Sequence, residues 1–243
     1  MTIKAKIRLF VDAPLGKGQS LSLPKDQVHY ITGVMRQKTG AMIALFNGLD
    51  GEWQAELVEA GKRKVHLICR AQSKPQKTPP DVWLYFAPIK KSRTDFIVEK
   101  AAELGAARII PVQTDFTNAE RIRQDRLQAH AVEAAEQCGE TYVPPVEDLQ
   151  KLSKVLDNWS DDRKLLFCDE TLVENATQML TGAKGEKWAI LIGPEGGFSE
   201  QEITRLRTMK ATHSISLGPR ILRADTAAVA ALTLWQNTLG DWR

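Results

Sequence analysis

Two glycine-proline stretches near the C-terminus decide the fold prediction: LIGPEGGFS at residues 191–199 and LGPRILRADT at residues 217–226. A short apolar run precedes each stretch, and a helical pattern follows it. We therefore interpret each stretch as the end of a strand, a tight turn and the start of a helix. Because ligands bind outside the carboxyl ends of strands in open α/β sheets, two such loops side by side predict one pocket of backbone amides and carbonyls.

The first loop carries signals for a defined geometry. Ser199 and Glu202 have the spacing of a capping box at the start of the next helix. The glycines at 193, 196 and 197 permit a ligand to approach the backbone closely. Either loop taken alone is also consistent with an ordinary turn. The nucleotide motifs G-x-G-x-x-G and G-x-x-x-x-G-K-[ST] are absent, so neither a dinucleotide nor a triphosphate site is predicted.

Bulk composition favours a soluble protein of the reducing cytoplasm. The chain has 243 residues, and we find no apolar run of membrane-spanning length and no secretory signal. Cys69, Cys138 and Cys168 are isolated within apolar runs, which predicts buried thiols and not disulfides. Because the four histidines are equally scattered, no metal site is expected.

Charge and pattern divide the chain. Residues 1–78 hold 13 Lys and Arg against 6 Asp and Glu, whereas the remainder holds 20 against 24. A basic first third is consistent with a polyanion-binding module or with a solvated, lysine-rich surface. Strand-like runs at 3–11, 19–23, 41–46, 52–58 and 64–68 predict a small β module such as a barrel, with one helix opening at 24–26. The polar, proline-rich segment 73–81 is the predicted linker between domains 1–72 and 82–243.

After the linker, strands alternate with helices. Strands are expected at 82–86, 108–112, 164–168, 188–192 and 214–217, and residues 141–163 are expected to form a loop with a short helix. This alternation predicts a parallel sheet with helices on both faces. The last helix, from about 226 to 238, is rich in alanine, which suits either an internal core position or close packing against a second subunit.

The two C-terminal stretches together resemble the paired motifs of the RsmE family, the 16S ribosomal RNA (uracil-N3) methyltransferases of the SPOUT superfamily. The resemblance extends upstream through KKSR at 90–93, EKAAELG at 99–105, IPV at 110–112, EAAEQCG at 133–139, HYITGVMR at 29–36 and LFNG at 45–48. Two positions depart from the family pattern: members often have Lys-Gly at 90–91 and Arg-Thr-Glu-Thr at 223–226. The second departure keeps the carboxylate but shortens it.

The resemblance implies a C-terminal domain of SPOUT type, an α/β parallel sheet with a trefoil knot, preceded by a PUA-like RNA-binding β-barrel. It also implies a homodimer whose active site uses both chains, and S-adenosylmethionine as methyl donor, with no metal. The expected donor-binding residues are Leu191, Ile192, Gly193, Gly197, Ser216, Leu217, Gly218 and Leu222. The implied RNA partner is 16S ribosomal RNA within the small subunit, and the candidate RNA contacts are Arg8, Arg36, Lys38, Lys62, Arg63, Lys64, Lys90 and Lys91. Trp53 would either stack on a base or pack in the barrel core.

Methylation of uracil N3 requires deprotonation of an imide, so a cation near the uracil oxygens would stabilise the developing charge. Arg223, Arg220 and Arg93 are the candidates. Glu195 or Asp225 would accept the proton, orient an arginine or only brace a loop. Two other functions stay open: a non-catalytic RNA-binding dimer, and another SPOUT methyltransferase acting on transfer RNA or a ribose hydroxyl.

Overall fold

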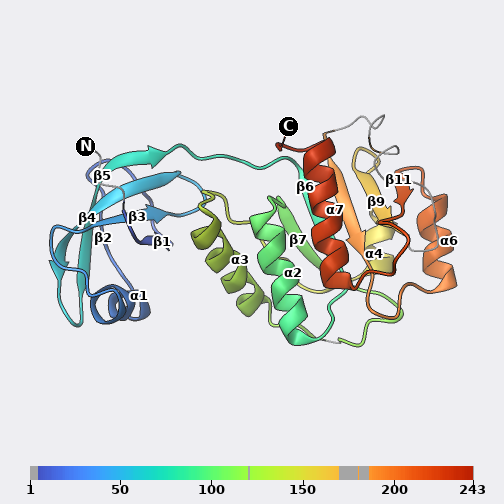
Figure 1. Cartoon of the computed structure of the whole chain (residues 1–243), viewed down its shortest axis with the longest axis horizontal. Helices are drawn as coiled ribbons and strands as arrows, with labels where there is room; N and C mark the ends of the chain where they lie inside the picture. Colours follow the sequence, from blue (N-terminus) through green and yellow to red (C-terminus); the bar gives the residue numbers. More distant parts are fainter. Residues whose placement is uncertain (1–4, 120, 170–179, 181–185, 243) are drawn as a thin grey trace. The chain divides into compact units, whose positions relative to one another are not determined.

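The computed structural model describes residues 5–119, 121–169, 180 and 186–242. The chain forms two compact units (Figure 1). Unit 1 comprises Met1–Thr78 and Ala135–Val143, and unit 2 comprises Pro79–Ala134 and Pro144–Arg243. The sequence places the second unit in one continuous segment, whereas the structure assigns residues 135–143 to the first unit.

Unit 1 is a curled five-stranded sheet with strand order β1-β3-β4-β5-β2. Its elements are β1 (Arg8–Phe10), β2 (Ser20–Ser22), α1 (Lys25–His29), the π-helix η1 (Tyr30–Val34), β3 (Met42–Phe46), β4 (Glu52–Ala60) and β5 (Val65–Lys74). Alternating apolar residues of these strands form one core, closed by Val28 and Ile31 of the helical segment. Those two residues face the same side because they are about one helical turn apart.

Strand β5 corrects one boundary of the sequence interpretation. It continues to Lys74, so residues 73 and 74, placed in the linker, belong to the strand, and Lys74 is paired with Glu52 of β4. The side chains of β5 are exposed from residue 70 onward. The backbone pairing therefore persists without apolar side chains, which is why composition does not mark the end of the strand.

Unit 2 is a parallel sheet of six strands in the order β11-β9-β10-β6-β7-β8. Its strands are β6 (Val82–Phe86), β7 (Arg108–Gln113), β8 (Gln150–Lys151), β9 (Lys164–Cys168), β10 (Trp188–Ile192) and β11 (Thr212–Ile215). Its helices are α2 (Lys91–Glu103), α3 (Gln124–Cys138), α4 (Leu152–Asp157), α6 (Glu200–Thr208) and α7 (Ala224–Thr238). The alternation of strands and helices thus yields the predicted parallel α/β sheet, while the trefoil knot stays a prediction.

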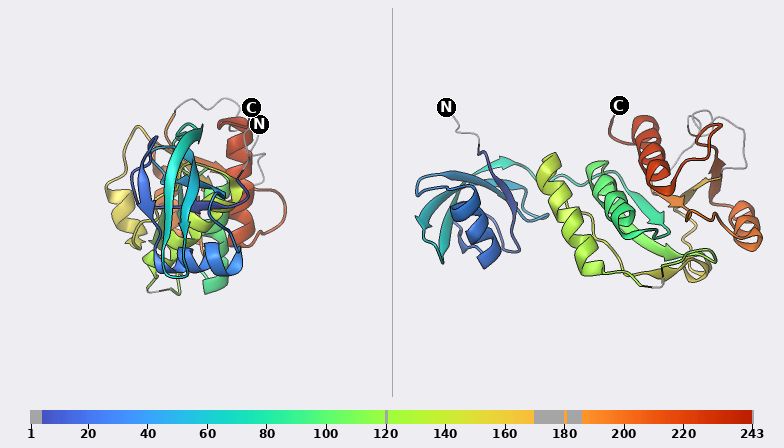
Figure 2. Two further views of the ribbon diagram at one scale, coloured as in Figure 1. Left: turned by 90° about the vertical axis from the view of Figure 1, so that its left-hand side faces the viewer. Right: turned by 60° about the horizontal axis from the view of Figure 1, so that its bottom comes forward.

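Helices cover both faces of this sheet. Helices α2 and α7 pack against each other, and α7 also contacts β10; both views of unit 2 place this pair on one face (Figures 1 and 2). On the other face, Leu152 and Leu156 of α4 and Leu206 of α6 join a core cluster with strand residues such as Leu191. Neighbouring strand residues point to opposite faces, and every residue of β10 is buried. The central strand that leads into the first glycine-proline loop is therefore rigidly held.

The cysteines depart in part from expectation. Cys69 is buried, and burial raises the pKa of its thiol despite a backbone hydrogen bond. Cys168 is half-buried at the end of β9, and Cys138 is exposed. The prediction of a buried Cys138 is wrong, because the buried face of α3 ends with Ala135, one turn earlier.

Candidate active site

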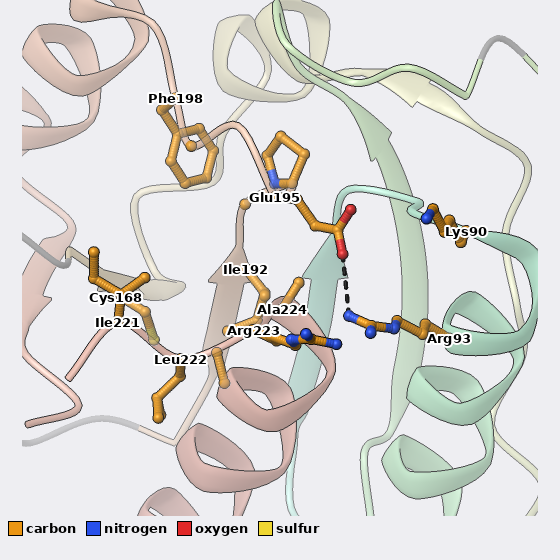
Figure 3. Close-up of a pocket in the computed structure, with 14 residues that line it drawn as sticks. Lys90, Arg93, Cys168, Ile192, Glu195, Phe198, Ile221, Leu222, Arg223 and Ala224 are labelled. Atoms are coloured by element: carbon orange, nitrogen blue, oxygen red, sulfur yellow. Dashed lines mark hydrogen bonds and ion pairs between the residues drawn. The ribbon is translucent and has the colours of Figure 1, made fainter.

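The two glycine-proline stretches lie together at the carboxyl ends of the strands. A cavity of about 420 Å³ is lined by residues of both stretches, by the start of α2 and by the end of β9 (Figure 3). Its lining residues are Lys90, Arg93, Cys168, Ile192, Gly193, Pro194, Glu195, Gly197, Phe198, Ile221, Leu222, Arg223, Ala224 and Ala227. We call this the loop cavity. Its volume lies in the range of small-molecule sites.

The first loop owes its shape to packing at its start and capping at its end. The ring of Phe198 packs edge-on against Phe167 of β9, with ring centroids 5.3 Å apart. A Cβ atom on Gly193 would lie 2.6 Å from this ring, so only glycine fits there. At the exit, Ser199 and Glu202 form the predicted capping box. Glu202 also accepts a hydrogen bond from the backbone of Asp115, which ties the loop to the end of β7.

A polar cluster lies on one side of the loop cavity. Arg93 Nη1 donates a hydrogen bond to Glu195 Oε1 at 3.1 Å (Figure 3). Arg93 Nε lies 3.8 Å from Asp225 Oδ2. The Arg93 side chain is 28% exposed, so it is accessible from the cavity while both carboxylates hold it. Lys90 and Arg223 add two more cations to the lining. The lining therefore holds three basic side chains and one acidic one.

The catalytic candidates separate into two groups. Arg93, Arg223 and Glu195 line the loop cavity, and Asp225 contacts Arg93. Arg220 is exposed and does not line the cavity, although it is only three residues from Arg223.

The donor-binding candidates separate in the same way. Ile192, Gly193, Gly197 and Leu222 line the cavity. The remaining four, Leu191, Ser216, Leu217 and Gly218, do not. Leu191 is buried in the sheet, and the Ser216 hydroxyl is bonded to the backbone of Gly218.

Several lining residues were not singled out from the sequence as site residues. Phe198 and Ile221 lie inside the quoted stretches, next to the candidates Gly197 and Leu222. Cys168 ends a predicted strand, and this position at a carboxyl end was the signal that could have identified it. Lys90, expected only as an RNA contact, also lines the loop cavity.

Most of the candidate RNA contacts in unit 1 are exposed, but Arg8 is not. Arg36, Lys38, Lys62, Arg63 and Lys64 are exposed. The Arg8 side chain is 14% exposed and forms an ion pair with Glu52 at 2.7 Å. Its guanidinium lies 3.7 Å from the centroid of the Phe46 ring and donates hydrogen bonds to the backbone oxygens of Ala135 and Glu140.

These contacts assign Arg8 to the structure of unit 1 and do not favour a phosphate contact. Burial raises the pKa of Glu52, but hydrogen bonds from Arg8 and Ser73 and the charge of Lys74 outweigh it and leave that pKa below its usual value. Trp53 is half-buried against the core of unit 1 and donates its indole N–H to the Asp50 carbonyl. This packing favours the core role over base stacking.

The described part of the chain contains no group of three His, Cys, Asp or Glu side chains arranged to hold a metal ion. No helix within that part has the length and hydropathy needed to cross a bilayer.

Comparisons with known proteins agree on one family. A family model described as an RNA methyltransferase domain matches residues 76–236, and one described as an RNA methyltransferase PUA domain matches residues 23–68. Ribosomal RNA small subunit methyltransferase E of Rickettsia conorii is 32% identical, with 93% of each chain covered. The Bacillus subtilis protein of the same name is 30% identical, with 88% of each chain covered.

Solved structures extend this likeness to the whole chain. Ribosomal RNA small subunit methyltransferase E from Neisseria gonorrhoeae, solved with bound S-adenosyl methionine, has a TM-score of 0.87 at 27% identity and covers 98% of this chain and 99% of its own. A putative methyltransferase from Legionella pneumophila, solved with the same cofactor, also has a TM-score of 0.87 at 27% identity and covers 98% of this chain and all of its own. The chain therefore belongs to the ribosomal RNA small subunit methyltransferase E family of RNA methyltransferases.

Proposed function

We propose that this chain transfers the methyl group of S-adenosylmethionine to N3 of a uridine in the 16S ribosomal RNA of the small subunit. The observation that carries the proposal is the loop cavity, in which two backbone loops meet a cluster of arginines and a carboxylate. Family membership and the cofactor bound in two related structures support it.

The loop cavity has features that suit the methyl donor. S-adenosylmethionine supplies an electrophilic methyl group on a sulfonium. Ile221 and Leu222 offer apolar surface for an adenine ring, and the backbone of Gly193, the first residue after β10, offers hydrogen-bonding groups to its edge. Glu195 supplies a negative charge that would favour a sulfonium nearby.

Arg93 and Arg223 account for activation of the acceptor. The N3 atom of uracil carries a proton, so it becomes nucleophilic only when that proton leaves and negative charge spreads to the two carbonyl oxygens. A guanidinium directed at those oxygens stabilises this charge, and it does so more strongly in a partly buried site than in water. Glu195 and Asp225 hold Arg93 in position. In this proposal Glu195, which lines the cavity, also accepts the proton.

The substrate and helix α7 support two further parts of the proposal. A substrate within the small ribosomal subunit supports a cytoplasmic location. One side of α7 packs inside unit 2, yet Val229, Ala230 and Leu234 on its remaining surface are apolar and only half-buried. A helix that is apolar on more than one side favours burial against another surface, which supports a homodimer.

Nucleoside mass spectrometry tests the proposed reaction. Ribosomal RNA from a deletion strain should lack one uridine that carries a methyl group on its base and none on its ribose. The gene supplied in trans should restore this nucleoside. Loss of a ribose-methylated nucleoside, or of a transfer RNA modification, would assign the chain to another branch of methyltransferases.

Isothermal titration with S-adenosylmethionine separates an enzyme from a non-catalytic RNA-binding protein. We expect saturable binding with one site per chain. A chain that binds RNA but shows no heat with S-adenosylmethionine would contradict the catalytic proposal.

A further inference from the structure

A second cavity lies in unit 2, beside the start of α2 and the segment that leads into α3. It has a volume of about 390 Å³. Lys91 and Thr94 line it from α2, and Arg121, Ile122 and Arg126 line it from the segment around the start of α3. We call it the flanking cavity.

The rim of the flanking cavity is cationic. Its one acidic residue, Asp95, is 8% exposed and forms an ion pair with Arg126. Lys91 and Arg121 are exposed, and among the described residues neither has an ion-pair partner. Two positive charges at the rim are therefore available to an anionic ligand.

The wall of the flanking cavity is apolar. Ile89 and Ile122 are half-buried there, and Leu127 beside them is buried. Nucleic-acid sites for single strands combine a surface on which a base can lie with cations that contact the phosphates. A cavity of about 390 Å³ with an apolar wall and a cationic rim suits a nucleotide, which has both an apolar base and a phosphate. Inorganic phosphate has no apolar part to contact the wall.

The two cavities adjoin along one turn of helix. Lys90 and Arg93 line the loop cavity, while Lys91 and Thr94 line the flanking cavity (Figure 3 shows the first pair). If an RNA strand places one base in the loop cavity, the adjacent nucleotide would therefore lie near Lys91 and Arg121.

We infer that the flanking cavity binds a nucleotide adjacent to the methylated uridine, with its base against Ile89 and Ile122 and its phosphate at Lys91 and Arg121. This inference rests on the proposed function, because it assumes an RNA substrate in the loop cavity. Phosphate contacts position an RNA without reading its sequence. Lys91 and Arg121 are thus positioning residues, which act on RNA affinity and not on the transfer step.

The double variant Lys91→Glu/Arg121→Glu tests this role. The matched control is Lys154→Glu/Lys210→Glu, which changes the charge equally at two exposed lysines that line neither cavity. The full-length chains are compared in affinity for unmodified 16S ribosomal RNA, in KM and kcat on unmodified small subunits, and in binding of S-adenosylmethionine.

We expect the flanking-cavity variant to raise the RNA Kd and KM at least about tenfold, with kcat and donor binding within about twofold of wild type. The salt dependence of log Kd should become shallower by about 0.7 for each phosphate of single-stranded RNA that the variant no longer neutralises. The control should stay within about twofold of wild type. Equal losses in both variants, or no loss in either, would overturn the inference.

Photo-cross-linking of the wild-type chain provides a measurement that does not depend on the folding of a variant. RNA carrying 4-thiouridine next to the target position should cross-link to a peptide that contains Ile89 or Ile122. Cross-links confined to other peptides would contradict the assignment.

The same measurements separate an RNA site from a protein-binding site. Weaker binding to small subunits with unchanged binding to naked RNA would show that the cavity contacts a ribosomal protein, and the inference would fail while the proposed function stands. Conversely, if the wild-type protein binds RNA through the flanking cavity but does not methylate it, the proposed function would be contradicted and the cavity would remain an RNA-binding site.

Discussion

Arg93 illustrates how a single side chain acquires its role from distant partners. Glu195 is 102 residues away along the chain, and Asp225 comes from a third segment, yet both lie beside the guanidinium. At position 225 this chain has the shorter acid where family members often have glutamate. The Arg93–Asp225 separation of 3.8 Å, against 3.1 Å to Glu195, makes Glu195 the closer partner.

Replacement of Arg223 tests electrostatic stabilisation at the loop cavity. Arg223→Ala should lower kcat by about 10²-fold, the effect of removing one donor to developing negative charge. Its Tm should change by less than about 2 °C, because the side chain is exposed. Arg220→Ala, which removes an arginine outside the cavity lining, should lower kcat much less. Equal losses in the two variants would contradict the selective role of Arg223, as would full activity of Arg223→Ala.

At the scale of elements, β10 and the loop that follows it form the rigid wall of the site. Position 193 depends on the absence of a side chain, since the Phe198 ring occupies the space where a Cβ would lie. A Cβ on Gly196 would have its nearest neighbour at 3.4 Å, an ordinary contact. Gly196→Ala is therefore a matched control for Gly193→Ala.

We expect Gly193→Ala to destabilise the protein by about 1–3 kcal/mol, because Phe198 must leave its packing on Phe167. The displaced ring should also weaken binding of S-adenosylmethionine. Gly196→Ala should stay within about 0.5 kcal/mol of wild type. Urea unfolding and calorimetric titration measure both effects, and equal stability of the two variants would show that the ring does not hold the loop.

His213 in β11 makes the stability of the sheet depend on pH. Its ring packs on Trp188, with centroids 5.2 Å apart, and burial, followed by the charge of Lys164, holds the pKa of His213 below the usual 6.5. The unfolded chain therefore binds this proton more readily than the folded protein. The contribution of neutral His213 to the free energy of unfolding is therefore complete above about pH 6.5, and it is lost as the pH falls below that value.

Urea unfolding at about pH 7.5 and about pH 5.5 measures this dependence. The wild type should lose more stability between the two conditions than His213→Gln, which keeps a polar side chain but cannot titrate. An identical loss in both proteins would exclude His213 as a source of the pH dependence.

At the scale of the whole molecule, the remaining question is whether two chains build one site. The exposed Ile221 at the loop cavity and the half-buried apolar residues of α7 are consistent with a covering partner. Sedimentation equilibrium should give twice the chain mass of 27.1 kDa at concentrations where the enzyme is active. A monomer that retains full specific activity would contradict an active site that requires two chains.

Local sequence patterns are sufficient to predict the order and type of most elements. The apolar runs at 82–86, 164–168 and 188–192 coincide with β6, β9 and β10, because a short, continuous apolar run is a local signal for a buried parallel strand. The capping box at Ser199 and Glu202 was equally local. These features depend on residues only a few positions apart.

Local patterns do not show which side chains share a site, because that depends on how distant segments pack. Contacts between distant segments bring Arg93 and Glu195 together in the loop cavity. Such contacts also turn Arg8 inward and leave Arg220 outside the cavity lining. The same holds for the assignment of residues 135–143 to unit 1 and for the pairing of β5 beyond its apolar residues. Periodicity reports which face of an element is buried, but it carries no information about which other element covers that face.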